Sequence, residues 1–492
     1  MKPITLLVPA LALALGACAT AASAPGGGGS GAAAITADDL RRDLFFLSSD
    51  SMRGRLGATE DELRASVWLA EQARRIGMEP AGDDGTYFQF FPLRRFRLSG
   101  ESTVSLGGRP LRLWRDVIVM GPVDARVDAP LMVADGTLIP AGGAAGRVVV
   151  AALRQPPNPP PADVSLREYR YTASAVAAQR NVLSAATPAA IVLVADSVGL
   201  MAFDNMVKFQ RQGRYLLDTA GVNPRAGVSP IPVFLVRPGV IPAATEGLRL
   251  TADLRTESFV YPSVNVVARV PGSDPSVRGE HVVFSGHQDH DGVHHPVNGD
   301  SIWNGADDNA TVSVALLAIG RAFVRQPGRR SALFVWHGAE ERGLLGSNWY
   351  ARTPTVPRQS LVAVLNGDMI GRNHPDSAAL LGMIPPHRNS TALVEMAMAA
   401  NPGFAIDSTW DAPSHPEGWY FRSDHLPYAR AGIPAIFFTT LLHPDYHTPE
   451  DEPERIDITK LERMTRWMYA TGWAVANAPQ RPTVDPGFRL ER

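Results

Sequence analysis

Five short stretches of this chain carry side chains that can bind metal ions or transfer protons. Each contains a histidine or a carboxylate, and each adjoins a run of apolar residues typical of a strand or a helix. In chain order the stretches are Gly286–Asp289, Asn304–Asn309, His337–Glu341, Asn366–Met369 and His443–Pro449. Histidine nitrogens mixed with carboxylate oxygens form a ligand set that suits zinc.

Any one of these stretches has an ordinary explanation. An acidic residue before a helix is usually a cap, and Glu340–Glu341 on its own would be a solvated surface pair. Five such stretches together are much harder to explain as coincidence. The carboxyl ends of the strands in an open α/β sheet meet at one edge, so residues that follow these strands lie near one another. The stretches therefore predict a single metal site.

The elements that must position this site alternate between strand and helix from Ser263 onward. The predicted strands are Val264–Ala268, His281–Ser285, Ala332–Trp336, Leu361–Leu365 and Ala435–Phe438. The predicted helices are Ala310–Val324, Gly343–Ala351, Ser390–Ala399 and Ile458–Ala476. Two earlier helices are predicted, one capped by Thr36 and one at Asp61–Ile76. This pattern predicts an α/β fold, a doubly wound mixed sheet flanked by helices.

The stretch 113–256 differs in composition from the rest. It contains no histidine, and short β-rich runs lie between its proline- and glycine-rich segments. The runs are Val117–Met120, Val148–Ala152, Ala190–Val194 and Val233–Val236. We predict an inserted, mostly β domain without metal chemistry. It divides the metal-site domain into residues 36–112 and 257–480, and a C-terminal tail follows at 481–492.

The N-terminus has the features of an export signal. Lys2 precedes the apolar run Ile4–Leu15, which is too short to span a bilayer stably. The run leads into Leu-Gly-Ala-Cys, which resembles a bacterial lipobox with Cys18 at the lipidation position. We expect a lipoprotein signal peptide at 1–17 and a flexible glycine-rich tether at 18–35.

This signal predicts an exported protein, either a periplasmic or a cell-surface lipoprotein. The alternative is cleavage after Ala24, which would release a secreted protein. Cys18 is the only cysteine, so a disulfide within the chain and a cysteine-rich metal site are both excluded. The formal net charge of −2 provides no basic excess for phosphates. We therefore expect no nucleic-acid partner, and membrane contact only through the lipid at Cys18.

Taken together, the motifs resemble those of the bimetallic zinc aminopeptidases, metallopeptidase family 28 of clan MH. They run in the family's order and span about Ser263 to Ala476. The matching stretches are Gly286–Asp289, Gly305–Asn309, Glu340–Ser347, Asn366–Gly371, Ser423–His425 and Tyr446–Thr448. The resemblance implies a zinc exopeptidase fold of the phosphorylase/hydrolase-like type. It also implies a protease-associated domain at the position of the inserted segment.

The resemblance implies a ligand set for two zinc ions. His287 and Asp368 would hold one ion, and Glu341 and His447 the other. Asp308 would bridge both, while the adjacent Asp307 would face away or cap the helix.

Roles for the surrounding residues follow from the same resemblance. Asp289 would accept a hydrogen bond from the ring of His287. The two ions would share a water and lower its pKa, with Glu340 as the general base. Tyr446 would donate a hydrogen bond to the developing oxyanion. Asp424 and His425 would support the ligands or contact the substrate.

Several neighbouring residues have two alternative interpretations. His290, Asp291, His294 and His295 would belong to a solvated, mobile loop or, alternatively, to an auxiliary metal site. His443 would shape the entrance to the site. The aromatic residues Trp419, Tyr420 and Phe421 would line a side-chain pocket or belong to the core.

The resemblance favours an aminopeptidase acting on peptides. A carboxypeptidase or dipeptidase is an alternative on the same scaffold, as is a one-zinc glutaminyl cyclase. A non-catalytic surface binding protein is a further alternative. Retention of every ligand of both zinc ions disfavours the cyclase. A non-catalytic binding protein would be expected to lose ligands or the base, and none is missing here.

Overall fold

The computed structural model describes residues 30–134, 139–159, 161, 164–223, 229–242 and 247–492. Ten strands of this part form the main sheet, in the order β19-β18-β20-β17-β13-β16-β12-β2-β9, with β1 beside β12. Their bounds are β1 Glu79–Pro80, β2 Phe88–Leu98, β9 Arg214–Leu217, β12 Thr256–Val270, β13 His281–His287, β16 Ser331–His337, β17 Leu361–Gly367, β18 Ser377–Leu381, β19 Ala405–Ile406 and β20 Ala435–Thr439. The central strands β16, β13, β17 and β20 are parallel, and β12 is antiparallel to β16. The predicted mixed sheet is confirmed.

Helices cover both faces of this sheet, because its central strands are apolar on both sides. One face packs on α1 Ala37–Leu47, α2 Glu60–Ile76, α6 Thr311–Arg325, α8 Thr391–Ala399 and α10 Ile458–Asn477. The other packs on α7 Leu345–Arg352 and α9 His425–Arg430. Along β13, Val282 and Phe284 point to the first face, and Val283 points to the second. The strands and helices predicted for this half of the chain are confirmed.

A second sheet of eight strands is described, in the order β4-β3-β11-β6-β7-β8-β10-β5. Its strands are β3 Thr103–Leu106, β4 Arg109–Leu111, β5 Val117–Val119, β6 Ala125–Val133, β7 Val148–Ala152, β8 Ala190–Val194, β10 Val233–Val236 and β11 Arg249–Leu254. All four predicted β-rich runs are strands. Because β3 and β4 precede residue 113, the sheet begins before the predicted boundary.

The inserted segment is also less purely β than its composition suggests. It contains helices α3 Arg167–Ser184, α4 Ser197–Met201 and α5 Phe203–Gln212. The reason is strand direction: β6, β7, β8 and β10 run parallel, and parallel neighbours need a crossover connection, usually a helix. Strand β9 leaves this segment and pairs with β2 in the main sheet.

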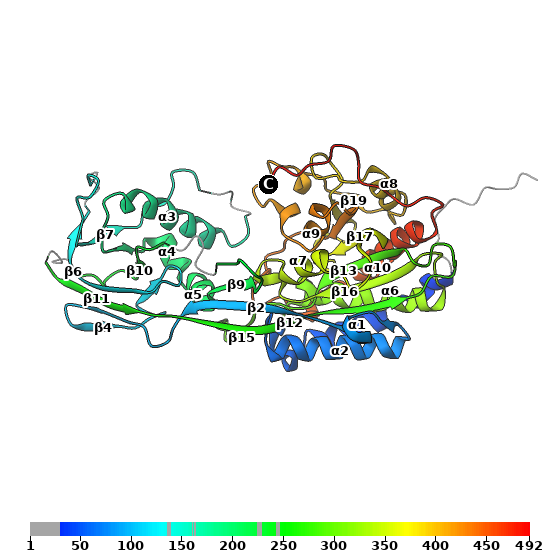
Figure 1. The fold of residues 1–492 in the computed structure, drawn as a ribbon, viewed down its shortest axis with the longest axis horizontal. Coiled ribbons are helices and arrows are strands. Elements are labelled where there is room, and N and C mark those ends of the chain that lie inside the picture. Colours follow the sequence, from blue (N-terminus) through cyan, green and yellow to red (C-terminus); the bar gives the residue numbers. More distant parts are fainter. Residues whose placement is uncertain (1–29, 135–138, 160, 162–163, 224–228, 243–246) are drawn as a thin grey trace, which may run out of the picture.

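Two long antiparallel strands connect the two sheets. β2 and β12 pair from Leu98 with Thr256 to Phe88 with Val266. Figure 1 shows them running from the part built on the second sheet to the part that contains β13 and β16. The inserted segment is therefore joined to the main sheet by the pairing of β9 with β2 and by the chain that continues from β11 into β12.

The N-terminal expectations are tested only in part. The predicted signal peptide, Cys18 and most of the tether lie outside the described residues. Residues 31–35, predicted to lie in the flexible tether, instead pack on the core. Ile35 is fully buried, the amide of Gly31 donates to Gln326 Oε1, and Arg466 donates to the carbonyls of Ala32 and Ile35. Among the described residues, no helix combines the length and apolar character needed to cross a membrane.

Arg55 joins the N-terminal helices to the predicted site. It is fully buried, and its guanidinium donates to the carbonyls of Gln288, Leu47, Asn304 and Gly305 at 2.6–3.0 Å. Burial lowers its pKa to about 10, so it is charged at neutral pH.

Arg55→Met should strip these carbonyls of their donors and cost at least about 3 kcal/mol of unfolding free energy, measured by denaturant titration. The control is Arg53→Met, whose side chain is 55% exposed and 3.4 Å from Asp61. Equal stability of the two variants would contradict the role given to Arg55.

Candidate metal centre

The predicted site residues lie at the carboxyl ends of the central parallel strands. His287 is the last residue of β13, and Asp368 follows β17 directly. Glu340 and Glu341 follow β16, and His447 lies in the segment after β20. The chain passes from β13 to its neighbour β16 on one side and then crosses back to β17 on the other side of β13, so the connections reverse direction here. Such a switch point is where open α/β sheets place their functional groups.

The first cluster is centred on His287. Its Nε2 lies 3.3 Å from Asp308 Oδ1, 3.5 Å from Asp368 Oδ2 and 3.9 Å from Glu340 Oε2. His287, Glu340 and Asp368 can each direct one ligand atom at a common point. All are buried, which removes competing water.

The second cluster is centred on Glu341 and His447. His447 Nε2 lies 3.2 Å from Asp308 Oδ2 and 3.3 Å from Glu341 Oε1. A further residue completes this cluster, because His290 Nδ1 lies 3.0 Å from Glu341 Oε1 and 3.9 Å from Asp308 Oδ2. The four side chains can direct their ligand atoms at one point.

Asp308 is the residue that the two clusters share. One carboxylate oxygen faces His287 and the other faces His447. The adjacent Asp307 points elsewhere: its carboxylate accepts from the amide of Gly371 at 2.7 Å. The amides of Asp307 and Asp308 both donate to Asp451, which fixes this turn before α6. Of the two aspartates, Asp308 is the one that faces both clusters.

The residues present fit metal ions. The ring nitrogens His287 Nε2 and His447 Nε2 and the oxygen Asp308 Oδ1, which face the clusters, are buried without a hydrogen-bond partner. Ligands about 2.0–2.2 Å from a tetrahedral zinc are about 3.2–3.6 Å from one another. The distances from Asp308 to His287 and His447 fall in this interval. Buried ligand atoms that lack a hydrogen-bond partner and lie at this spacing favour the binding of a cation.

The charges of the two clusters depend on one another. The pKa of His287 is raised well above its usual value: burial opposes its charge, but Glu340 and Asp368 outweigh that effect. The pKa of Asp308 is held well below its usual range, because His287 and His447 outweigh the cost of its burial. Protons on the histidines thus balance the carboxylates, and a bound metal would take their place.

The Asp289 atom that contacts the ring of His287 is the main-chain oxygen. His287 Nδ1 lies 3.1 Å from the main-chain carbonyl of Asp289, not from the carboxylate. This contact still directs Nε2 toward the carboxylates. The Asp289 carboxylate instead accepts from the amide of Glu340 at 2.9 Å. It therefore positions the predicted base rather than the ligand.

The expectation of a solvated, mobile loop after His287 is wrong. His290 and Asp291 are buried, and the hairpin of β14 Gly292–Val297 and β15 Asp300–Trp303 follows them. The Asp291 carboxylate contacts Lys208, Arg342 and His447. The sequence offered His290 only as part of an alternative auxiliary metal site, because a second histidine three residues from a ligand is often solvent-exposed. Its location between two acidic stretches was the available signal.

Tyr446 is half-buried beside the clusters. Its hydroxyl accepts from Arg422 Nη2 at 2.9 Å. Burial raises the pKa of this hydroxyl, so it keeps its proton at neutral pH. It can therefore act as a hydrogen-bond donor.

The remaining predicted residues are divided between site and core. Asp424 is buried, its carboxylate oxygens lack a hydrogen-bond partner, and burial raises its pKa to about 7. His425 packs 4.7 Å from the Tyr420 ring and 5.0 Å from the Phe437 ring, in the core. Trp419 and Tyr420 are buried in the same aromatic cluster. His443 is buried, with Nε2 3.5 Å from Asp307 Oδ2, rather than exposed at an entrance.

An α/β sheet that gathers histidines and carboxylates at its strand ends has the architecture of a metal-dependent hydrolase. The family comparison is more specific. Residues 265–472 match the model of Peptidase family M28.

Known proteins resemble the chain in sequence and in fold. A probable leucine aminopeptidase from Arthroderma otae is 29% identical over 191 residues, covering 37% of this chain and 48% of the relative. Aminopeptidase YwaD from Bacillus subtilis is 29% identical over 185 residues, covering 36% and 39%. The chain thus spans about half the length, or less, of these curated relatives.

Two solved structures have a similar fold. BSAP, a zinc aminopeptidase from Bacillus subtilis, has a TM-score of 0.55 at 18% identity, covering 92% of this chain and 99% of that one. The aminopeptidase from Aneurinibacillus sp. strain AM-1 has a TM-score of 0.54 at 16% identity, covering 92% and 97%. The likeness extends well beyond the segment matched by the family model.

Proposed function

We propose that this protein is a zinc-dependent aminopeptidase that releases N-terminal residues from peptides with two zinc ions per chain. The observation that carries the proposal is the pair of buried clusters joined by Asp308. The match of residues 265–472 to the model of Peptidase family M28 supports peptide hydrolysis. The names of the relatives, which are aminopeptidases, support cleavage at the N-terminus.

The ligands divide between the two ions. His287 and Asp368 would hold one ion, Glu341 and His447 the other, and Asp308 would contact both. His290 is a further ligand candidate for the second ion. When bound, the zinc ions supply Lewis acidity, which lowers the pKa of water to about 7 and polarises a carbonyl.

Glu340 is the proposed general base. Its carboxylate is buried at the edge of the first cluster, and Asp289 holds its main-chain amide. Burial raises its pKa well above the usual range, and the charge of Glu341 adds to the rise. A carboxylate with a raised pKa can take a proton from water and give it to the leaving amine.

Tyr446 is the proposed oxyanion donor. The Tyr446 oxygen accepts a hydrogen bond from Arg422, so the Tyr446 proton remains available to donate to the substrate. Removing one such donor costs roughly 10²–10³ in kcat in other hydrolases.

A panel of substrates tests this proposal. We expect the metal-loaded protein to hydrolyse aminoacyl-p-nitroanilides, to lose this activity in a chelator and to regain it with added zinc. N-acetylated peptides are the matched control, because their amine is blocked. A preference for blocked peptides would replace the aminopeptidase with a carboxypeptidase, and turnover of N-terminal glutamine alone would indicate a cyclase.

We also propose export and lipidation at Cys18, on the basis of the lipobox-like sequence. Labelled palmitate should enter the protein in a bacterial host and should be absent from the Cys18→Ser variant. Unlabelled wild-type protein in the medium would favour the secreted alternative.

A further inference from the structure

Two chains of polar contacts, each containing a buried carboxylate, lead from the inserted segment to Tyr446 and His447. The first, here called the Arg170 relay, consists of Arg170, Glu417, Arg422 and Tyr446. The second, the Lys208 relay, consists of Lys208, Asp291 and His447. Arg170 lies on α3 and Lys208 on α5, whereas their targets are adjacent residues beside the metal centre.

The Arg170 relay depends on Glu417, which is 1% exposed. Its carboxylate accepts from Arg170 Nη1 at 2.7 Å and from Arg422 Nη1 at 2.5 Å. The amide of Ser165, also in the inserted segment, donates to it at 2.5 Å. Arg422 lies 4.6 Å above the Trp419 ring and uses its other terminal nitrogen to donate to the Tyr446 hydroxyl.

These contacts determine where the Tyr446 proton points. Because the oxygen accepts from Arg422, the proton is free for a different partner. Without Arg170, Glu417 would lose a charged partner and Arg422 could shift. The hydroxyl would then lose the contact that sets its orientation.

The Lys208 relay reaches the metal ligand next to Tyr446. Lys208 and Asp291 form an ion pair in which each side chain is 1% exposed. The ammonium also lies 3.7 Å from the centre of the Trp303 ring. Asp291 Oδ2 is 2.9 Å from His447 Nδ1, which leaves Nε2 toward Asp308 and Glu341. A carboxylate behind a ligating histidine fixes its ring and raises its basicity.

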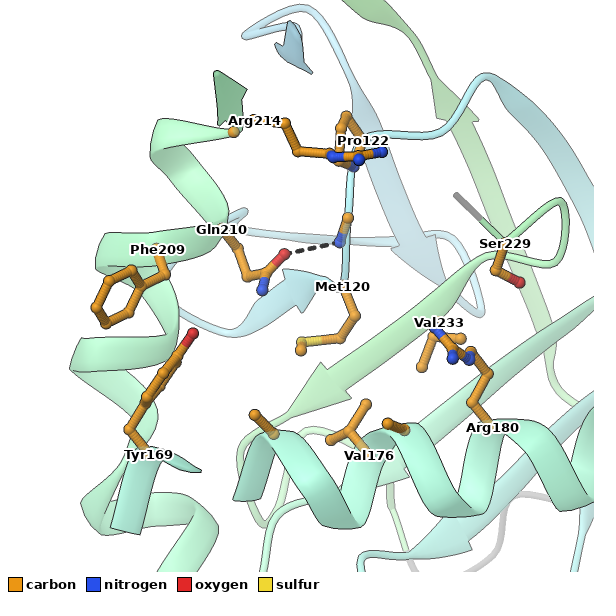
Figure 2. Close-up of a pocket in the computed structure, with 14 residues that line it drawn as sticks. Met120, Pro122, Tyr169, Val176, Arg180, Phe209, Gln210, Arg214, Ser229 and Val233 are labelled. Carbon is orange, nitrogen blue, oxygen red and sulfur yellow. Dashed lines mark hydrogen bonds between the residues drawn. The ribbon is translucent and has the colours of Figure 1, made fainter. Parts of the chain in front are cut away.

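The two helices that carry these relays pack on each other. The rings of Tyr169 and Phe209, each next in sequence to a relay residue, lie 4.4 Å apart between their centres. Figure 2 shows them beside a pocket of about 420 Å³ between α3 and α5. None of its lining residues is a candidate metal ligand.

We propose that the inserted segment contributes to the active site. It positions Tyr446 through the Arg170 relay and His447 through the Lys208 relay. Arg170 and Lys208 are positioning residues, since neither touches the substrate or the metals. The proposal rests on the roles given above to Tyr446 and His447.

Arg170→Met tests the first relay. We expect kcat to fall about 10-fold, part of the 10²–10³ expected for losing the donor outright, with KM and zinc content unchanged. Arg170→Lys should recover part of the loss. Arg180→Met on the same helix is the control, since its guanidinium bonds only the exposed Asn181 among the described contacts. Wild-type kcat in Arg170→Met would overturn this relay.

Lys208→Met tests the second relay through metal retention. We expect the second zinc to be lost to a chelator at about 10- to 100-fold lower chelator concentration, the usual effect of removing a partner behind a ligand. Arg211→Met, exposed on the same helix, is the control. Lys208→Gln, which removes the charge but keeps a polar side chain, covers the case in which the methionine variant does not fold. Wild-type zinc retention in a folded Lys208 variant would overturn the relay.

The two levels of the proposal can fail separately. An active wild-type enzyme that is insensitive to Arg170 would refute the relay and leave the proposed function standing. A wild-type protein with no aminopeptidase activity would refute the function, and zinc retention would still test Lys208.

Discussion

Glu340→Gln is expected to keep both zinc ions and lose on the order of 10³-fold in kcat. The glutamine has the same shape but cannot accept the proton of water, and general-base catalysis contributes about 10²–10⁴-fold. Its amide hydrogen bond to Asp289 involves the main chain and survives the change. Steady-state kinetics and metal analysis on the same preparation measure the two effects.

Glu341→Gln is the informative comparison. The neighbouring residue contacts His290 and His447, so its replacement should release zinc as well as activity. Glu395→Gln, exposed on α8, should change neither. Full turnover in Glu340→Gln would exclude it as the base.

Asp308→Asn should have the largest effect on metal content. It contacts both clusters, and the amide removes the negative charge that both ions would share. We expect zinc to fall from about two ions to less than one per chain after dialysis, and activity to be lost with it. Elemental analysis of the dialysed protein gives the stoichiometry.

Asp307→Asn is the matched control at the adjacent position. Its carboxylate accepts hydrogen bonds from Gly371 and Thr311 and does not face either cluster. We expect it to retain zinc and to lose roughly 1–3 kcal/mol of stability. Zinc loss in Asp307→Asn with retention in Asp308→Asn would reverse the assignment.

The local sequence was sufficient for the positions that follow strands. His287, Glu341 and Asp368 come directly after apolar runs, and parallel strands bring their carboxyl ends to one edge. The resemblance favours Asp308 over Asp307 as the shared ligand, which stays a prediction; in the structure, the Asp307 carboxylate accepts from the amide of Gly371.

Contacts between distant segments were not accessible to this reasoning. His290 reaches Glu341 only because the chain folds back into the β14–β15 hairpin. Arg170 and Lys208 come from a segment without histidine, whose composition predicted no metal chemistry. Their importance arises from buried ion pairs across long sequence separations, and no local pattern encodes those pairs.

The placement of Asp289 shows a second limit. The resemblance implies that it orients His287, and in the structure the contact is made by its carbonyl instead of its carboxylate. Backbone and side-chain acceptors at one position serve the same purpose in orienting a ring. Sequence alone does not distinguish them.

Anomalous diffraction at the zinc absorption edge, on crystals of the metal-loaded protein, tests the central claim most directly. We predict two peaks about 3.5–4 Å apart, one beside His287 and Asp368 and the other beside Glu341 and His447, with Asp308 between them. A single peak, or peaks away from these side chains, would contradict the two-metal centre.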